Sequence, residues 1–188
     1  NQSAAEDGKI LVIGTGIAGL MTALSLGPHP VVLVSKGALG QQSSSQWAQG
    51  GISAALAADD SPDLHSQDTL AVSGDIADED IVDLVTKNGP NRIKTLSKLG
   101  VMFDRDGTTL SLRKEAAHSR RRVVHANGDS TGQEIMRALT EKVLNSSHIT
   151  LIEDSEATDL IVGSGIVSGA VILRSGTVEL IRSQSVVL

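Results

Sequence analysis

Residues 9–34 read KILVIGTGIAGLMTALSLGPHPVVLV, and this stretch predicts the fold. An apolar run, Lys9–Ile13, is typical of a buried strand and leads directly into a glycine-rich turn at residues 14–19. Apolar side chains then recur at helical spacing until Gly27 and two prolines end the helix. The β-branched run Val31–Val34 follows and predicts a second buried strand. The stretch therefore predicts a βαβ unit, and with it an α/β fold with parallel strands.

The three glycines of this turn have the spacing of a dinucleotide-binding motif. Gly14 allows the tight turn, Gly16 lets the backbone come close to a pyrophosphate, and Gly19 lets helix and strand pack closely. The helix N-terminus offers N–H groups to the negative charge of a phosphate. Because the motif follows a strand and opens a helix within about 30 residues, we predict a bound dinucleotide rather than a glycine turn without a ligand.

The turn alone leaves the identity of the dinucleotide open. An acidic residue about 20 residues further on usually binds the ribose hydroxyls of NAD. Here the second strand ends in Ser35-Lys36, so that acid is absent and NAD is disfavoured. A hydroxyl and the backbone could still bind a ribose, and Lys36 would attract a phosphate.

Composition excludes several other classes of protein. The 188 residues are 40% hydrophobic and 20% charged, which argues against widespread disorder. A formal net charge of −6 has the wrong sign for a nucleic-acid binder, so we interpret Arg120–Arg122 as an anion-binding or salt-bridging segment. Cysteine is absent, which excludes disulfides and cysteine-ligated metals, and the histidine and carboxylate spacing suggests no metal site. No apolar run is long enough to cross a membrane, so we expect a cytoplasmic protein without a membrane partner.

The rest of the chain predicts further helices and strands. An ordered loop is expected over residues 36–58, and a hairpin over Val101–Leu112 turns at Asp106-Gly107. Helices are expected over 63–73, 78–88, 91–99 and from Ser130 or Thr131 to Leu144, and strands over 150–152, 157–162, 167–173 and 177–181. The scarcity of aromatic residues and the apolar run Ser185–Leu188 at the end of the chain predict a fragment.

One loop after the second strand carries a family resemblance. Residues 43–52, SSSQWAQGGI, resemble the flavoprotein family of succinate dehydrogenase, fumarate reductase and L-aspartate oxidase. Within that family, residues 112–122 (LRKEAAHSRRR) and His125–Gly132 are most similar to the L-aspartate oxidases. The resemblance extends over residues 9–188. It implies a Rossmann-like α/β FAD-binding domain with an added β-rich segment, of which residues 1–188 would be the N-terminal part. The capping domain and the C-terminal helical domain would be absent, and this piece alone would be inactive.

The turn and the resemblance together predict the cofactor site. The membrane-bound relatives attach FAD covalently through a histidine just before Ala-Gln-Gly-Gly, and Ser44 stands at that place here, so the resemblance implies non-covalent FAD. Trp47 could stack on the flavin or anchor its loop as a buried side chain. The predicted FAD contacts are Gly14, Thr15, Gly16, Ile17, Ala18, Gly19, Ser35, Lys36, Ser44, Ser45, Gln46, Trp47, Ala48, Gln49, Gly50, Gly51, Glu156 and Ala157.

The resemblance also implies a substrate contact. Glu115 matches the acidic residue that orients the amino group of aspartate, and an ammonium group requires such an anion. Without the resemblance, Glu115 would be interpreted as a surface carboxylate pairing with Arg113 or Lys114. The family's Glu-Gly-Gly-His reads EAAH here, at residues 115–118, which changes the backbone but keeps the carboxylate. His118 and His125 flank the basic run and could act as acid or base, but we assign neither a catalytic role.

The implied activity is oxidation of L-aspartate to iminoaspartate. Hydride would pass from Cα to flavin N5, and oxygen or fumarate would reoxidise the flavin. The product would feed quinolinate and NAD biosynthesis, with functional coupling to quinolinate synthase. A fumarate reductase or succinate dehydrogenase type of flavoprotein and a non-catalytic dinucleotide-binding module remain as alternatives.

Overall fold

The computed structural model describes residues 8–41 and 43–188 and divides into two compact units. Unit 1 contains the chain up to Gln46 and again from Met136 to Leu188. Unit 2 contains Trp47–Ile135. The boundaries fall inside the short helix η1 (Ser44–Trp47) and inside helix α4 (Thr131–Leu144). Helix α4 confirms the helix that the sequence predicts from Ser130 or Thr131 to Leu144.

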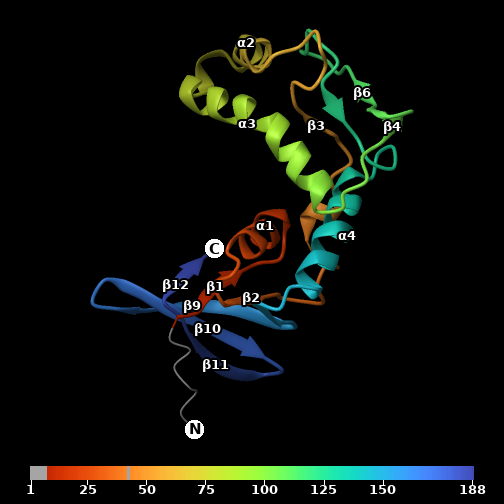
Figure 1. Ribbon diagram of the computed structural model, residues 1–188. Helices are drawn as coiled ribbons and strands as arrows, with labels where there is room; N and C mark the ends of the chain where they lie inside the picture. The colour runs from red at the N-terminus through yellow and green to blue at the C-terminus, as the bar shows by residue number, and fades with distance from the viewer. Residues whose placement is uncertain (1–7, 42) are drawn as a thin grey trace. The chain divides into compact units, whose positions relative to one another are not determined.

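Unit 1 is built on a parallel sheet with strand order β12-β1-β2-β8 (Figure 1). Its strands are β1, Ile10–Ile13; β2, Val31–Val34; β8, Ile149–Ile152; and β12, Ser185–Val187. Helix α1, Ile17–Ser25, connects β1 to β2, which pair in parallel. All four residues of β2 are buried, as its β-branched sequence predicts for an inner strand. The predicted βαβ unit is confirmed.

The β-rich segment forms an antiparallel sheet in the same unit, with order β11-β10-β9. Its strands are β9, Ser155–Gly163; β10, Ile166–Arg174; and β11, Thr177–Arg182. Ala170 and Ile172 of β10 share a buried cluster with residues of β1 and β2. The second sheet therefore contributes to the core on which the glycine turn rests, and the predicted strands are confirmed.

Three helices follow one another in unit 2: α2, Pro62–Ser73; the short helix η2, Gly74–Ile76; and α3, Glu79–Lys98. Helix α2 starts after Ser61, whose hydroxyl accepts from the Leu64 N–H. Helix α3 starts after Asp78, whose carboxylate accepts from the Ile81 N–H. The two helices pack against each other (Figure 1).

Helix α3 corrects the prediction of two separate helices over 78–88 and 91–99. The helix continues through Pro90, although proline lacks the N–H that the preceding turn would bond. Thr86 before the proline and Ile93 and Leu96 after it are buried, so the helix packs on both sides of the proline, and this packing outweighs the lost bond. Neither α3 nor any other helix in the described part of the chain is long and apolar enough to cross a membrane.

Short strands complete unit 2. Strands β3 (Ile52–Ser53), β7 (Val123–Val124) and β6 (Leu112–Arg113) form one antiparallel sheet in that order. Strands β4 (Arg105–Asp106) and β5 (Thr109–Leu110) form the predicted hairpin. The predicted ordered loop after β2 contains η1 and β3.

The Gly19→Ala variant should test how tightly the turn is packed. A Cβ at residue 19 would overlap the carbonyl oxygen of Gly14, whereas a Cβ at Gly50 would meet nothing within 4 Å. We expect Gly19→Ala to lower the free energy of unfolding by about 3 kcal/mol or to prevent folding, because backbone cannot move aside as a side chain can. Gly50→Ala is the matched control and should fold with nearly unchanged stability in urea denaturation. Equal stability of the two variants would contradict the close approach.

Candidate functional site

The glycine turn lies between β1 and α1 in unit 1. Gly14 has a φ of 106°, a left-handed conformation that favours glycine, and its N–H donates to the Val34 carbonyl at 3.0 Å. Gly19 sits against the Gly14 backbone with no room for a side chain. The turn therefore directs the chain tightly from strand into helix.

The N-terminus of α1 is suited to an anion. Gly16, the residue before the helix, provides no side-chain cap, and no acidic residue lies in the first turn. The Ile17 N–H donates to the Ser45 hydroxyl at 3.3 Å. A Cβ at Gly16 would lie 3.3 Å from the same oxygen, so the glycine keeps this approach open. The residues present thus fit a pyrophosphate held by backbone N–H groups and a hydroxyl.

The C-terminal end of β2 brings together the other predicted contacts of unit 1. The buried Ser35 hydroxyl lies 2.8 Å from the Thr15 hydroxyl. Lys36 Nζ donates to Glu156 Oε1 at 2.8 Å, and both side chains are exposed. An acid therefore does lie beside the end of β2, but it comes from β9 rather than from the residues that follow the turn. Ala157 packs against the core of unit 1.

The loop after η1 is held at its ends and exposed in the middle. The Gly132 N–H donates to the Ala48 carbonyl at 2.9 Å, while Gln49 and Gly50 are exposed. Gly51 packs against β7 and the His125 ring without room for a Cβ. Trp47 is 77% exposed, so the interpretation of this residue as a buried anchor is wrong. Its stacking on a flavin stays a prediction.

Glu115 lies in the loop between β6 and β7. Its side chain is half-exposed, and its Oε1 is 3.5 Å from Nε2 of the buried His125. Arg113, one of the two cations considered as its surface partner, pairs with Asp129 at 3.6 Å instead. The carboxylate is therefore placed beside a histidine that was not predicted as its partner.

The two alanines that replace the family's glycines have different backbones. Ala117 has a φ of 69°, in the left-handed region that costs a residue with a Cβ roughly 1–2 kcal/mol. Ala116 is not among the described residues with a positive φ. The departure from the Gly-Gly pattern thus places strain at the second position only, two residues from Glu115.

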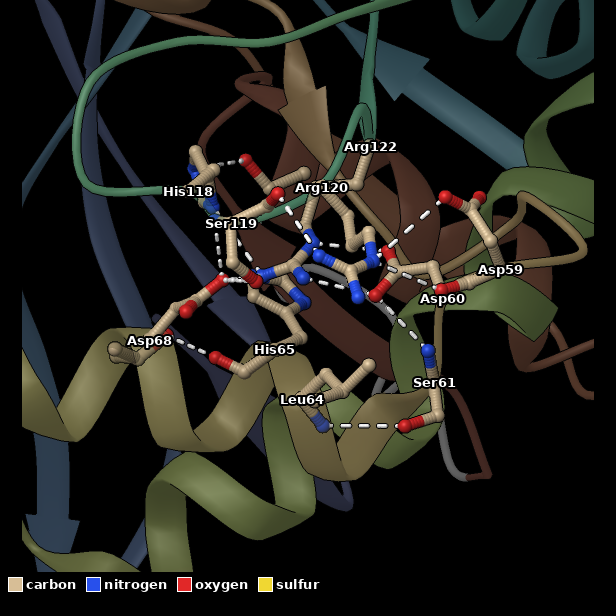
Figure 2. Close-up of polar contacts among 12 residues, drawn as sticks. Asp59, Asp60, Ser61, Leu64, His65, Asp68, His118, Ser119, Arg120 and Arg122 are labelled. Atoms are coloured by element: carbon tan, nitrogen blue, oxygen red, sulfur yellow. Dashed lines mark hydrogen bonds and ion pairs between the residues drawn. The ribbon is translucent and has the colours of Figure 1, made fainter.

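A charge network holds the same loop against α2 (Figure 2). Arg122 is fully buried, and its Nε and Nη2 donate to the two carboxylate oxygens of Asp60 at 2.9 and 2.8 Å. Its Nη1 donates to Asp68 at 2.8 Å. This confirms the salt-bridging interpretation of the basic run. Because the guanidinium is desolvated, removing one carboxylate would leave some of its N–H donors without an acceptor, which typically costs about 1–3 kcal/mol.

The network extends from Arg122 into the loop that carries Glu115. Asp68 Oδ2 accepts from both the N–H and the hydroxyl of Ser119 at 2.7 Å (Figure 2). His118 Nδ1 lies 3.4 Å from Arg122 Nη1, and its Nε2 lies 3.2 Å from the Ser53 hydroxyl. Sequence reasoning identified neither aspartate, since nothing local distinguishes Asp60 or Asp68 from other surface acids.

Two members of this region have displaced pKa values. Burial, together with the positive charge of Arg122, lowers the pKa of His65. Burial alone would raise the pKa of Asp68, but hydrogen bonds from Ser119 and Arg122 lower it below its usual value. Both groups therefore favour their neutral-pH forms, the neutral imidazole and the carboxylate.

The parallel βαβ unit, the tight glycine turn and the uncapped helix N-terminus define a dinucleotide-binding domain of the Rossmann-like class. Residues 9–188 match the protein family described as FAD binding domain. The chain belongs to this family, and FAD is its cofactor.

Similar proteins agree with this assignment. The chain is 47% identical over 183 residues to an L-aspartate oxidase of Mesorhizobium japonicum, covering 96% of this chain and 36% of the relative. It is 46% identical over 160 residues to that of Agrobacterium fabrum, covering 85% and 31%. A solved quinol-fumarate reductase with menaquinol matches with a TM-score of 0.89 and 25% identity, over 99% of this chain and 33% of that one. The chain thus spans about a third of the length of these proteins.

Replacing the strained alanine should separate backbone strain from lost contacts. We expect Ala117→Gly to leave stability unchanged or raise it by up to about 1 kcal/mol, because glycine adopts a positive φ without strain. The neighbouring Ala116→Gly should lower it by about 0.5–1 kcal/mol through unfolded-state entropy. Urea unfolding of both variants measures the difference, and an equal loss in both would show that Ala117 is not strained.

Acidification should destabilise the protein in two stages. The lowered pKa of His65 means that the unfolded chain binds a proton first as the pH falls below about 6.5. The lowered pKa of Asp68 adds a second loss below about pH 4, so both contributions are present at neutral pH and disappear on acidification. Urea unfolding at pH 7.5, 5 and 3 tests this. In His65→Gln the first loss should shrink and the second remain. An unchanged pH dependence in that variant would rule out the contribution of His65.

Proposed function

We propose that this chain provides the FAD-binding part of an L-aspartate oxidase. The observation that carries the proposal is the 47% identity to a curated L-aspartate oxidase over 96% of the chain. Since the chain spans 36% of that relative, turnover is proposed for a protein of the relatives' length that contains residues 1–188. The reaction would convert L-aspartate to iminoaspartate.

The proposed cofactor contacts are the ones that the sequence predicts. Gly14–Gly19 would hold the FAD pyrophosphate at the N-terminus of α1, where Ser45 adds a hydroxyl. Lys36 and Glu156 would contact the adenosine part, and residues 47–51 the flavin. Ser44 occupies the place of the covalently attached histidine, which supports non-covalent binding. When bound, FAD would supply the acceptor for the hydride that leaves Cα.

Glu115 is proposed to recognise the substrate's amino group. Its side chain is half-exposed, so a ligand can reach the carboxylate, and the loop that carries it is fixed by the Arg122 network. An anion at this point favours an ammonium-bearing dicarboxylate over succinate or fumarate, which carry no amine. Glu115 would therefore set the choice between amino and non-amino acids.

The wider role follows from the same proposal. Oxygen or fumarate would reoxidise the flavin, and iminoaspartate would pass toward quinolinate and NAD biosynthesis, with functional coupling to quinolinate synthase. A cytoplasmic location and the absence of nucleic-acid partners stay predictions.

The similarity to quinol-fumarate reductase favours a second candidate, a flavoprotein that acts on succinate or fumarate. That match has a TM-score of 0.89 but 25% identity, against 47% for the oxidase of Mesorhizobium japonicum. The higher identity supports the amino-acid substrate. The two candidates differ in whether an amine is required.

Two measurements test the proposal. Protein incubated with FAD and desalted should show a flavin absorption band, and acid should release the flavin, because no histidine attaches it. A protein of the relatives' length that contains residues 1–188 should then produce hydrogen peroxide with L-aspartate but not with succinate, and Glu115→Gln should lower kcat/KM for aspartate by about tenfold or more. As the control, Glu141→Gln on the exposed side of α4 should behave as the wild type.

A colourless protein that binds nicotinamide nucleotide tightly would overturn the cofactor assignment. Turnover with succinate and none with aspartate would instead select the fumarate reductase type.

A further inference from the structure

The ring of His125 is buried, and neither of its nitrogens is paired within the part of the chain that the structure describes. The residue is 4% exposed, and among the described residues neither ring nitrogen has a partner at hydrogen-bond distance. Leaving a buried polar group unpaired typically costs about 1–3 kcal/mol. The position of this ring therefore requires an explanation.

The backbone around His125 holds the ring in place. The residue directly follows β7, and its carbonyl accepts from the Asp104 N–H at 2.8 Å. Gly51 directly precedes β3, which pairs with β7, so Gly51 lies opposite His125. A Cβ at residue 51 would come within 2.9 Å of His125 Nε2. Because residue 51 is a glycine, no side chain competes with this nitrogen for the space.

The same nitrogen faces a carboxylate. His125 Nε2 is 3.5 Å from Glu115 Oε1, just beyond a hydrogen bond. Glu115 can close that gap by a side-chain rotation, since its side chain is 52% exposed, whereas the side chain of the histidine is buried. The loop on the far side of Glu115 is fixed through Ser119 and Asp68. Nε2 is therefore a fixed point toward which the carboxylate can turn.

We propose that His125 is a positioning residue that donates from Nε2 to one oxygen of Glu115 and turns the other oxygen toward the ammonium group of an α-amino dicarboxylate. This inference rests on the proposed function, because it assigns the partner of Glu115 in recognising the amine. The histidine contacts neither substrate nor cofactor in this arrangement. It reduces the number of orientations that the exposed carboxylate would otherwise sample before the ligand binds.

The ligand test compares two variants of His125 in a FAD-loaded protein of the relatives' length that contains residues 1–188. His125→Phe keeps the bulk but removes the donor, and His125→Gln keeps an N–H donor. Isothermal titration calorimetry with L-aspartate and with succinate gives the two dissociation constants. We expect His125→Phe to weaken aspartate about tenfold or more, with succinate unchanged, and His125→Gln to recover most of that loss. An equal effect on both ligands, or none on either, would overturn the proposal.

A second measurement needs no substrate and no His125 variant. The imidazole nitrogen chemical shifts of His125, recorded by NMR at neutral pH, should show a protonated Nε2, and Glu115→Gln should shift that resonance. The matched control is Asp129→Asn, which removes an exposed carboxylate that pairs with Arg113 in the same region and should leave the resonance unchanged. An unaffected His125 in Glu115→Gln would disprove the pair. A confirmed pair together with no binding of aspartate would instead count against the proposed function.

Discussion

The carbonyl of Gly14 occupies the space where a side chain at residue 19 would begin. This contact brings the first turn of α1 against the end of β1 and leaves the helix N-terminus open, without a side-chain cap or an acid in its first turn. The neighbouring features of unit 1 depend on it. Ser45 can reach the Ile17 N–H, and the end of β2 lies near enough for Ser35 to contact Thr15. A binding site for a pyrophosphate is thus formed mainly by backbone, and its geometry follows from the packing of strand on helix.

In unit 2, charged side chains hold a loop that contains little regular structure. The loop between β6 and β7 is attached by charge: Arg122 is fully desolvated between Asp60 and Asp68, and Asp68 also holds Ser119. Charge-assisted bonds impose directions that apolar contacts do not, although the desolvation of three charges limits how much they stabilise the fold. Ala117 shows that the loop follows a path its own residue disfavours. The surrounding bonds determine that path.

The sequence predicts what depends on local patterns. The βαβ unit follows from residues 9–34 because the strand, turn and helix signals lie next to one another, and the hairpin at Gly107 follows for the same reason. The break expected at Pro90 is wrong because Ile93 and Leu96 are buried beyond it, a fact of tertiary packing. Partners of charged groups were also beyond prediction. Lys36 pairs with Glu156, 120 positions away, and Arg122 pairs with Asp60, 62 positions away. No local sequence pattern indicates pairs so far apart in the chain.

The strand order of the parallel sheet has a consequence for synthesis on the ribosome. Strand β1 emerges well before its partner on one side, β12, which comes from residues 185–187. One edge of β1, with its apolar side chains and unpaired backbone, therefore stays open while most of the chain is translated. The dinucleotide turn at the end of that strand can be supported by β2 early, but the sheet beneath it is completed late. Nascent chains would thus have a prolonged period in which association with chaperones or with other chains competes with folding.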